Sequence, residues 1–469
     1  MFLNLDQHDK TKIAVKDDSG YVLTYGEVCD IINQLAELKL PRSVVFNLCE
    51  SCAGSLLGYL AFENNGQVPL LLSANMDKGL RTNLERAYLP SYYWMPERKA
   101  AEIDGEKLFS ACGYVLAKTN NEPYPLNEKL SMLLTTSGST GSPKLVRHKY
   151  GNLEANAANV AKAFSWTEEE NGICDLPMNY TMGLNVINSY LITGATVLMV
   201  KANLMDPEFW KFIKEQEGTS FTGVPFSYEV MRRIGFDKMD LPKLYTLAEG
   251  GGKLTDKMFK WVATYAKNSG KRFCATFGTS ETSARMAFLN PALALEKIGS
   301  IGKAIPDGEL YLIDEVKNED GSSTGELAYR GPNVTMGYAL CREDLLKGDE
   351  FCGEYHTGDI AKRDKEGYYF IIGRKGRFLK LYGLRVSLDE TERILKTQYP
   401  TVDFVCTGDD KRMNIFVTDE KLKDEIIPFI SEKTNIHNSA FRVYVIGAIP
   451  RNEYGKVKFV ELNEIMKNV

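Results

Sequence analysis

Residues 136–144, with the sequence Thr-Ser-Gly-Ser-Thr-Gly-Ser-Pro-Lys, combine the side chains best suited to hold a polyphosphate. The two glycines make the backbone flexible enough to present N–H groups, while five hydroxyls and Lys144 add O–H donors and a cation. The stretch is not a Walker A loop, because that motif requires Gly-Lys-Ser/Thr, whereas Pro143 precedes the lysine here and Leu145 follows it. We predict a phosphate-binding loop; a solvated Ser/Gly linker is the alternative interpretation.

Six further segments follow this loop in a fixed order. They are Pro-Met-Asn-Tyr-Thr-Met-Gly at 177–183, Glu-Gly-Gly-Gly-Lys-Leu at 249–254, Phe-Gly-Thr-Ser-Glu-Thr at 277–282, Tyr-His-Thr-Gly-Asp at 355–359, Gly-Arg at 373–374 and Pro-Arg-Asn-Glu-Tyr-Gly-Lys at 450–456. With the loop, the series resembles the adenylate-forming superfamily of acyl-CoA synthetases, peptide-synthetase adenylation domains and firefly luciferases. One such motif would be weak, so the resemblance depends on the complete series.

The resemblance implies ATP-dependent activation of a carboxylic acid. In this chemistry the carboxylate attacks the α-phosphate of ATP, pyrophosphate leaves, and the acyl-adenylate then passes its acyl group to a thiol. Each step moves negative charge, so the site must supply donors and cations where that charge develops. The implied reactants and cofactors are ATP, Mg²⁺, a small-molecule carboxylic acid, and the thiol of coenzyme A or of carrier-protein phosphopantetheine.

The same resemblance implies which residues hold the nucleotide. Phe277 would stack on the adenine, the alternative being a plain strand core residue, and Asp359 would accept the ribose hydroxyls, the alternative being a turn former. Glu281 would be the Mg²⁺ ligand, because this cation prefers hard oxygen donors; the alternative is a helix-capping acid. The full implied set is Thr136, Ser137, Gly138, Ser139, Gly141, Gly251, Gly252, Lys253, Phe277, Gly278, Ser280, Asp359 and Arg374.

Catalytic roles are implied for Lys456, Lys144 and Thr140. Lys456, in the final Gly-Lys, would contact the substrate carboxylate and the α-phosphate; a solvated tail lysine is the alternative. Gly376 stands at the hinge position, where the family has Asp or Lys, and glycine leaves both backbone angles free. Gly383 would let a pantetheine arm pass close to the backbone during transfer to the thiol.

The acyl pocket is expected among Tyr180, Met182, Thr222, Val224 and Glu249. Amino-acid-activating relatives carry an aspartate where this chain has Thr181, so an α-amino acid is a disfavoured substrate. Glu249 would select a hydroxyl or an amine if it faces the pocket, but a solvated strand-end residue is the preferred interpretation. Because Tyr150 occupies the position of the family's common histidine, His148 is expected on the surface.

Three functions follow as hypotheses. The first is an AMP-forming acyl-CoA synthetase, and the second is an acyl-adenylate ligase that loads a separate acyl or peptidyl carrier protein. The third, from another class, is a non-catalytic nucleotide-binding or scaffold homologue. The residues that argue against the third are Lys144, Glu281, Asp359, Arg374 and Lys456.

Elements that position these motifs can be predicted from apolar runs and helical periodicity. Strands are expected at 44–46, 68–72, 132–134, 197–200 and 273–277, and helices at 152–164, 207–215, 226–234 and 255–266. Their alternation predicts an α/β fold with mostly parallel, helix-covered sheets. We predict an AMP-binding N-terminal domain at 1–374, with a β-rich subdomain at about 299–372, and a small, mobile α+β domain at 377–469 that carries Lys456.

Composition limits the classes of protein that remain. The chain has 469 residues, a net charge of −5 and a pI near 5.7, which argue against a nucleic-acid binder. Its best apolar stretch, at 55–62, is too short to span a bilayer. The nine cysteines include one CxxC pair at 49–52, for which we predict two packed thiols at a helix start rather than a zinc site. We expect a cytoplasmic protein with reduced thiols.

Overall fold

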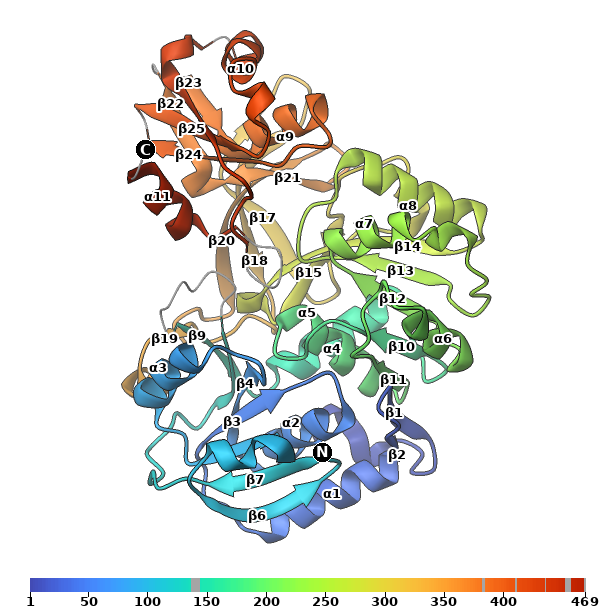
Figure 1. The fold of residues 1–469 in the computed structure, drawn as a ribbon. Helices are drawn as coiled ribbons and strands as arrows, with labels where there is room; N and C mark the ends of the chain where they lie inside the picture. Colours follow the sequence, from blue (N-terminus) through green and yellow to red (C-terminus); the bar gives the residue numbers. More distant parts are fainter. Residues whose placement is uncertain (136–143, 382–383, 410, 435, 452–456, 468–469) are drawn as a thin grey trace. The chain divides into compact units, whose positions relative to one another are not determined.

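The computed structural model describes residues 1–469 except 136–143, 382–383, 410, 435, 452–456 and 468–469 (Figure 1). The chain groups into two compact units. The first comprises Met1–Leu310 and Tyr329–Tyr355, and the second comprises Tyr311–Ala328 and His356–Val469. The predicted domain bounds near residues 374–377 and the predicted subdomain at 299–372 stay predictions.

The first unit contains a mixed nine-stranded sheet whose central strands are parallel. Its order is β16 (Lys303–Ala304), β15 (Ala284–Phe288), β14 (Arg272–Thr279), β13 (Thr246–Glu249), β12 (Ser220–Gly223), β10 (Asn171–Cys174), β11 (Thr196–Met199), β1 (Ile13–Asp17) and β2 (Val22–Thr24). The strands from β14 to β1 are parallel, and the strands added at both edges are antiparallel. The carboxyl ends of β12, β13 and β14 therefore meet at one edge of the sheet.

A mixed eight-stranded sheet is the second layer of this unit. Its order is β19 (Tyr338–Ala339), β9 (Leu145–Lys149), β8 (Leu130–Thr135), β4 (Val68–Ser73), β3 (Val44–Cys49), β5 (Tyr92–Pro96), β7 (Tyr114–Lys118) and β6 (Glu106–Ala111). The strands from β8 to β5 are parallel. On the other side of β8, β9 and β19 continue the sheet as antiparallel strands, so the short β19 lies at its edge.

Two helices of this unit, α2 (Ala53–Asn65) and α5 (Thr181–Leu191), are buried along almost their whole length. Their side chains join one large apolar core with residues of both sheets, which explains why neither helix shows a polar face. The remaining helices have a buried stripe and an exposed face. They are α1 (Tyr25–Glu37), α3 (Lys78–Tyr88), α4 (Asn152–Phe164), α6 (Pro207–Glu215), α7 (Pro225–Arg233) and α8 (Asp256–Asn268).

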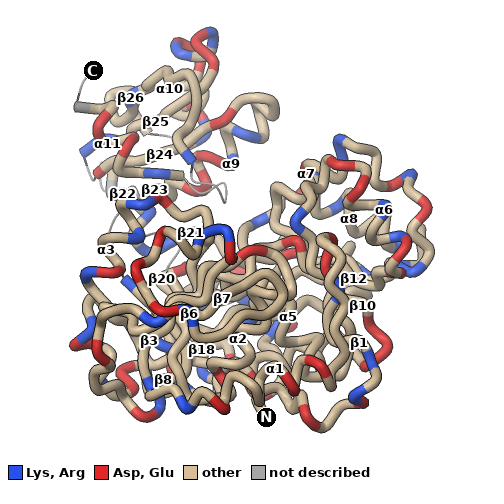
Figure 2. The backbone as a smooth tube through the Cα atoms, turned by 60° about the horizontal axis from the view of Figure 1, so that its bottom comes forward, with Lys and Arg blue, Asp and Glu red and all other residues tan. Residues whose placement is uncertain are grey.

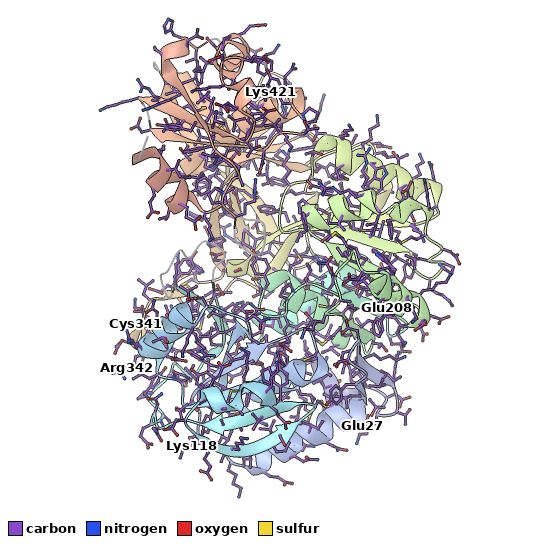
Figure 3. The ribbon with its side chains drawn as sticks, in the orientation of Figure 1. Glu27, Lys118, Glu208, Cys341, Arg342 and Lys421 are labelled. Carbon is purple, nitrogen blue, oxygen red and sulfur yellow. The ribbon has the colours of Figure 1, made fainter. Side chains whose placement is uncertain are left out.

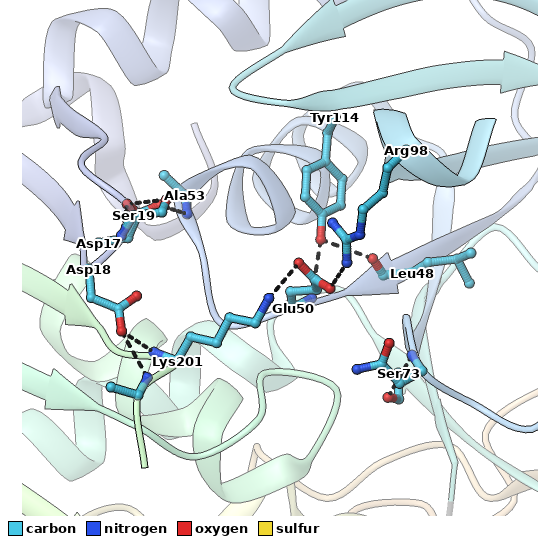
Figure 4. Close-up of polar contacts among 12 residues, drawn as sticks. Asp17, Asp18, Ser19, Leu48, Glu50, Ala53, Ser73, Arg98, Tyr114 and Lys201 are labelled. Carbon is cyan, nitrogen blue, oxygen red and sulfur yellow. Dashed lines mark hydrogen bonds and ion pairs between the residues drawn. The ribbon is translucent and has the colours of Figure 1, made fainter. Parts of the chain in front are cut away.

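Side-chain caps define where two of these helices begin. The Thr24 hydroxyl accepts from the Glu27 N–H, and the Glu27 carboxylate accepts from the Thr24 N–H at 2.8 Å, which is a capping box at the start of α1. Glu27 is labelled in Figure 3. At α2, the Asp17 carboxylate accepts from the Ala53 N–H at 2.9 Å (Figure 4). This contact pairs an N–H group that has no partner within the helix. The negative charge of Asp17 also interacts favourably with the helix dipole.

The polar cluster beside α2 has a structural explanation. Glu50 follows β3, and its carboxylate forms ion pairs with Arg98 and Lys201, both of which are more than half exposed (Figure 4). Asp18 accepts from the backbone N–H groups of Lys201 and Ala202 at 2.8 Å. These contacts tie β1, β3 and the end of β11 together.

The second unit is built from smaller sheets. Most residues of a four-stranded sheet, β17 (Glu309–Lys317), β18 (Ser323–Arg330), β20 (Glu354–Arg363) and β21 (Tyr369–Arg374), belong to it. A hairpin follows, β22 (Phe378–Leu381) and β23 (Leu384–Ser387), and then a three-stranded sheet of β24 (Phe404–Asp409), β25 (Arg412–Val417) and β26 (Phe441–Val445). Its helices are α9 (Leu388–Gln398), α10 (Ile426–Thr434) and α11 (Phe459–Lys467). Leu395, Ile415 and Ile430 are among the buried residues of its core.

The expected α/β class and the predicted elements are confirmed. All five predicted strands exist, as β3, β4, β8, β11 and β14, and α4 and α6 have the predicted bounds. The sheets are more mixed than expected, because antiparallel strands extend both. Basic and acidic residues are interspersed along the described chain (Figure 2). Among the described residues, no helix combines the length and apolarity needed to cross a bilayer.

Candidate active site

Tyr338 connects two residues that the sequence analysis placed in the site. Lys144 directly precedes β9, which pairs with β19 so that Tyr338 lies opposite Val146. The Lys144 ammonium lies 3.6 Å from the centroid of the Tyr338 ring, a cation–π contact. The Tyr338 hydroxyl donates to Glu281 Oε1 at 2.7 Å. The predicted phosphate-binding cation and the predicted Mg²⁺ ligand therefore share one aromatic residue.

Tyr338 stays a hydrogen-bond donor at neutral pH. Its pKa is raised, first by burial and next by the neighbouring Glu281 carboxylate, since both disfavour the phenolate. Sequence analysis missed this residue because it belongs to none of the motifs. The available signal was a tyrosine in a short strand-like stretch after Pro332 and Gly337, which by itself indicates no chemistry.

Most of the predicted phosphate loop lies outside the described residues. Thr136, Ser137, Gly138, Ser139, Thr140 and Gly141 are among the residues that are not described, so their roles stay predictions. The residues on either side are described. Thr135 ends β8 and lies opposite Leu145, the first residue of β9. The loop residues thus connect two paired strands, and Lys144 is held at the start of the second.

The segment after β14 brings Ser280 and Glu281 into one short 3₁₀ turn, Ser280–Thr282. The Ser280 hydroxyl is 2.6 Å from the Thr181 hydroxyl at the start of α5, so this turn contacts the helix that follows Tyr180. Phe277, on β14, is partly exposed, and its stacking on adenine stays a prediction.

Packing alone requires a glycine at position 278. A Cβ at this position would lie 1.6 Å from the carbonyl oxygen of Ala284, because β14 approaches β15 closely next to a β-bulge. Any side chain would therefore disrupt the pairing of β14 with β15. This requirement explains the glycine without a ligand, and its role in nucleotide binding stays a prediction.

The glycine run after β13 forms an exposed edge. Gly251 has a φ of +78°, a left-handed conformation that glycine adopts without strain. Gly251, Gly252 and Lys253 are exposed, whereas Gly250 is buried against Met182. The exposed backbone is compatible with a flat ligand, and the adenine-binding role of this run stays a prediction.

The predicted acyl-pocket residues come from three neighbouring elements. Met182 on α5, Thr222 on β12 and Glu249 on β13 are buried, while Tyr180 and Val224 are partly exposed. The preferred interpretation of Glu249 as a solvated strand-end residue is wrong, because only 4% of it is exposed. Glu249 ends an inner strand of the nine-stranded sheet, a position that the local sequence did not reveal.

Arg285, on β15, is a second residue that sequence analysis missed. It is fully buried and donates to Asn185 Oδ1 at 2.6 Å and to Thr222 Oγ1 at 3.0 Å. Its guanidinium also lies 5.2 Å from the Phe164 ring centroid. Burial lowers its pKa to about 10, so it stays charged at neutral pH. The available signal was an arginine within the otherwise apolar strand Ala-Arg-Met-Ala-Phe.

His148 was expected on the surface, and this expectation is wrong. It lies on β9 between β8 and β19 and is fully buried, because β9 is an inner strand of its sheet. Its Nδ1 is 3.3 Å from the Ser283 hydroxyl. Burial lowers its pKa to about 3, so the imidazole is neutral.

In the second unit, the two predicted ribose-binding residues lie opposite each other. Asp359 on β20 pairs with Arg374 on β21, and Arg374 Nε donates to Asp359 Oδ1 at 2.8 Å. The Asp359 side chain is 7% exposed and that of Arg374 is 61% exposed. The Thr357 hydroxyl accepts from the Asp359 N–H and donates to the Leu327 carbonyl. Asp359 is therefore held rigidly by its neighbours.

The predicted hinge and thiol-transfer residues are described only in part. Gly376 is exposed, and a Cβ there would meet no atom within 4 Å. Gly383 and Lys456 lie outside the described residues. Their predicted roles stay predictions.

Glu281 fits the predicted Mg²⁺ ligand. Among the described residues, no group of three or more His, Cys, Asp or Glu side chains forms a metal site. Mg²⁺ bound together with a nucleotide needs only one or two carboxylates, because phosphate oxygens and waters complete its coordination. Glu281 Oε1 accepts from Tyr338, which leaves the second carboxylate oxygen for the cation.

Comparison with known proteins points in the same direction. The family model described as AMP-binding enzyme matches residues 71–339. The chain is 27% identical over 380 residues to a probable CoA ligase of Humulus lupulus, and the match covers 72% of this chain and 61% of that protein. It is 25% identical to a 2-succinylbenzoate–CoA ligase of Bacillus cytotoxicus, with coverage of 74% and 72%. The chain thus spans less than two thirds of the first of these relatives.

Two solved structures share the fold. The O-succinylbenzoate coenzyme A synthetase of Bacillus subtilis in complex with AMP has a TM-score of 0.76 at 18% identity, covering 97% of this chain and 96% of that one. ATP-bound MatB from Rhodopseudomonas palustris also has a TM-score of 0.76, at 19% identity, with coverage of 100% and 99%. At these identities the likeness concerns the fold alone.

Proposed function

Because the chain belongs to the family of AMP-binding enzymes, we propose that it is an AMP-forming acid–thiol ligase. It activates a small carboxylic acid with ATP, releases pyrophosphate, and transfers the acyl group from the adenylate to coenzyme A. The observation that carries this proposal is the contact of Lys144 and Glu281 with opposite parts of Tyr338. A cation and a carboxylate fixed next to a Ser/Gly loop suit a nucleoside triphosphate with its divalent ion.

Each group of the first unit then has a defined task. Lys144 and the loop hydroxyls contact the β- and γ-phosphates and stabilise the leaving pyrophosphate. Glu281 holds Mg²⁺, which, when bound, neutralises charge on the phosphate oxygens. Ser280, whose hydroxyl contacts that of Thr181, is proposed to donate to the α-phosphate. Phe277 and the exposed run Gly251, Gly252 and Lys253 accept the adenine.

Asp359 is proposed to accept hydrogen bonds from the ribose hydroxyls. Its ion pair with Arg374 and its hydrogen-bonded backbone fix the carboxylate in one orientation, which reduces the ordering cost when ribose binds. Lys456 is proposed to contact the reacting carboxylate, as the Gly-Lys motif implies.

Coenzyme A is the favoured acceptor, because both relatives named above are described as CoA ligases. Loading of a separate carrier protein remains the second candidate and rests only on the sequence of residues 381–386. We also propose a cytoplasmic location, supported by nine cysteines that are all free in the structure.

Pyrophosphate release tests the proposal. The protein is incubated with ATP, Mg²⁺ and a panel of short, branched, aromatic, dicarboxylic and amino acids, with and without coenzyme A. We expect acid-dependent release of pyrophosphate and AMP, and an acyl-CoA product when coenzyme A is present. Release of ADP and phosphate instead would exclude adenylation, because it places the attack at the γ-phosphate.

Two pairs of variants connect the activity to the site. Lys144→Ala and Glu281→Gln should each lower the rate about 10²–10³-fold, as expected for loss of a group that stabilises developing charge. Their controls are Lys118→Ala and Glu208→Gln, exposed residues on β7 and α6 that are labelled in Figure 3. Equal effects in site and control variants would place the chemistry elsewhere.

A further inference from the structure

Arg285 is a buried cation whose hydrogen bonds all go to neutral groups. Its two terminal nitrogens contact the Asn185 amide oxygen and the Thr222 hydroxyl, and its Nε has no hydrogen-bond partner in the described part of the chain. Asn185 is itself fixed, because its amide nitrogen donates to Asn156 at 2.6 Å. A buried guanidinium without a counter-ion is destabilising. The fold therefore keeps an uncompensated positive charge at a rigid position.

Glu249 forms no ion pair with Arg285 in the described structure. Thr222, which contacts Arg285, lies opposite Ala248 in the parallel pairing of β12 with β13. Because side chains alternate along a strand, Glu249 points to the other face of the sheet from Thr222. Burial raises the pKa of Glu249 well above its usual value, and the attraction of Arg285 opposes this to a smaller extent.

Arg285 contacts the predicted acyl pocket. It donates to Thr222 Oγ1 at 3.0 Å, and in the pairing of β14 with β15 it lies opposite Gly278, two residues before Ser280. Met182 packs over Gly250, where a Cβ would lie 2.5 Å from its terminal methyl group. Methionine is flexible and unbranched, so Met182 can move aside for a ligand.

We propose that Arg285 binds a second, anionic carboxylate of the acid substrate, so that the enzyme activates a dicarboxylic acid in preference to a monoacid. This inference rests on the proposed function. The guanidinium is a charged donor, and a carboxylate accepts charge-assisted hydrogen bonds from it. A substrate amine is disfavoured here, because it would place a second cation beside Arg285.

The primary experiment compares substrates on the wild-type protein. Linear dicarboxylic acids of about three to six carbons are tested against their half-amides and against monoacids of equal length, with pyrophosphate release as readout. We expect kcat/KM for the best diacid to exceed that for its half-amide by about 100-fold, because the half-amide leaves the buried charge uncompensated. Equal or better turnover of the half-amide or monoacid overturns this inference and leaves the adenylation proposal intact. Absence of pyrophosphate with every acid overturns the adenylation proposal itself.

Variants then assign the preference to Arg285. Arg285→Gln should abolish the diacid preference through an increase in KM for the diacid, whereas Arg285→Lys, which keeps the charge, should fold even if Arg285→Gln does not and should retain part of the preference. The exposed Arg342→Gln, labelled in Figure 3, is the control. An unchanged diacid preference in folded Arg285→Gln, or an unchanged KM for the diacid in Arg285→Lys, overturns the assignment.

Discussion

At the scale of single residues, Tyr338 is the clearest candidate for a positioning role. Its ring contacts Lys144 and its hydroxyl contacts Glu281, so the two contacts can be removed separately. Tyr338→Phe keeps the ring and removes the hydrogen bond. We expect this variant to raise the Mg²⁺ concentration needed for half-maximal rate about 5-fold, corresponding to about 1 kcal/mol for one hydrogen bond to a carboxylate.

Tyr338→Leu is the matched comparison, because it removes the ring as well. It should add a further loss in KM for ATP, since Lys144 loses its cation–π partner, worth about 0.5–2 kcal/mol. Titrations of Mg²⁺ and of ATP separate the two effects. If both variants match the wild-type protein in both titrations, Tyr338 has no positioning role.

His148 supplies a prediction about acid stability. Its pKa is about 3 in the folded protein and about 6.5 when unfolded, so the unfolded chain binds more protons between these values. Stability is therefore complete above pH 6.5 and falls as the pH drops toward 3. Between pH 7.5 and pH 5 this histidine accounts for a loss of about 2 kcal/mol.

The variant His148→Gln should show a correspondingly smaller loss over this interval, even if its stability at pH 7.5 is lower. Urea unfolding at both pH values, followed by tryptophan fluorescence, reports on the first unit, because all four tryptophans lie in it. The exposed His437→Gln should behave as the wild type. An equal pH-dependence in His148→Gln would assign the acid sensitivity to other groups.

Local motifs predicted some of the candidate site and missed the rest for a physical reason. Lys144 and Glu281 were recognisable because each stands in a motif whose residue types suit phosphate chemistry. Tyr338 comes from an edge strand almost 200 residues further along the chain than Lys144, so only the β9–β19 pairing reveals their contact. Arg285 is recognisable only when its burial and its neutral partners are known.

At the scale of elements, periodicity predicted helices better than sheet edges. The bounds of α4 and α6 agree with the prediction because each helix has one apolar stripe and clear ends, such as Pro207 at the start of α6. Strands β6 and β19, which form the two edges of the eight-stranded sheet, were not predicted. Patterning is weak in an edge strand, because only one of its sides is paired.

One side chain holds β9 to the segments around it, and this can be tested. Arg147 on β9 is fully buried, donates to the carbonyls of Lys347 and Met336, and forms an ion pair with Glu350. Glu350→Ala leaves the buried guanidinium without its counter-ion and should lower the free energy of unfolding by about 2 kcal/mol, less than for a fully buried pair because Glu350 is half exposed.

Glu350→Gln is the control for this ion pair, because its amide oxygen still accepts from Arg147. It should cost no more than about 1 kcal/mol. Urea midpoints measured by tryptophan fluorescence compare the two variants. An unchanged urea midpoint in Glu350→Ala would show that the ion pair does not stabilise β9.

At the scale of the whole molecule, the order of the motifs can be read from the sequence. Which segments group into the same compact unit cannot. The second unit contains Tyr311–Ala328, which is separated in sequence from His356–Val469 by part of the first unit. Such a grouping depends on which strands pair, and β18 and β20 are neighbours in the four-stranded sheet although a long segment intervenes. Asp359 and Arg374 meet for the same reason, through the pairing of β20 with β21.

The final prediction concerns two half-reactions that the family resemblance assigns to different arrangements of the chain. Lys456→Ala should slow acyl-adenylate formation about 10²–10³-fold and leave transfer from preformed acyl-adenylate to the thiol largely intact. Its matched control is Lys458→Ala, whose ammonium pairs with Glu461 at 2.8 Å on the surface. Both are assayed with ATP and with a synthetic acyl-adenylate.

Gly376 should show the opposite pattern. Gly376 lies in the 3₁₀ turn Lys375–Arg377, whose φ angles of about −50 to −70° include the value that proline requires, but proline prevents a change of φ between the half-reactions. Gly376→Pro should therefore impair thiol transfer more than adenylation, while Gly376→Ala, whose Cβ meets no atom within 4 Å, should impair neither strongly. If Lys456→Ala and Gly376→Pro each reduce both half-reactions equally, a single static arrangement performs all of the chemistry. A hinge at Gly376 would then have no role in catalysis.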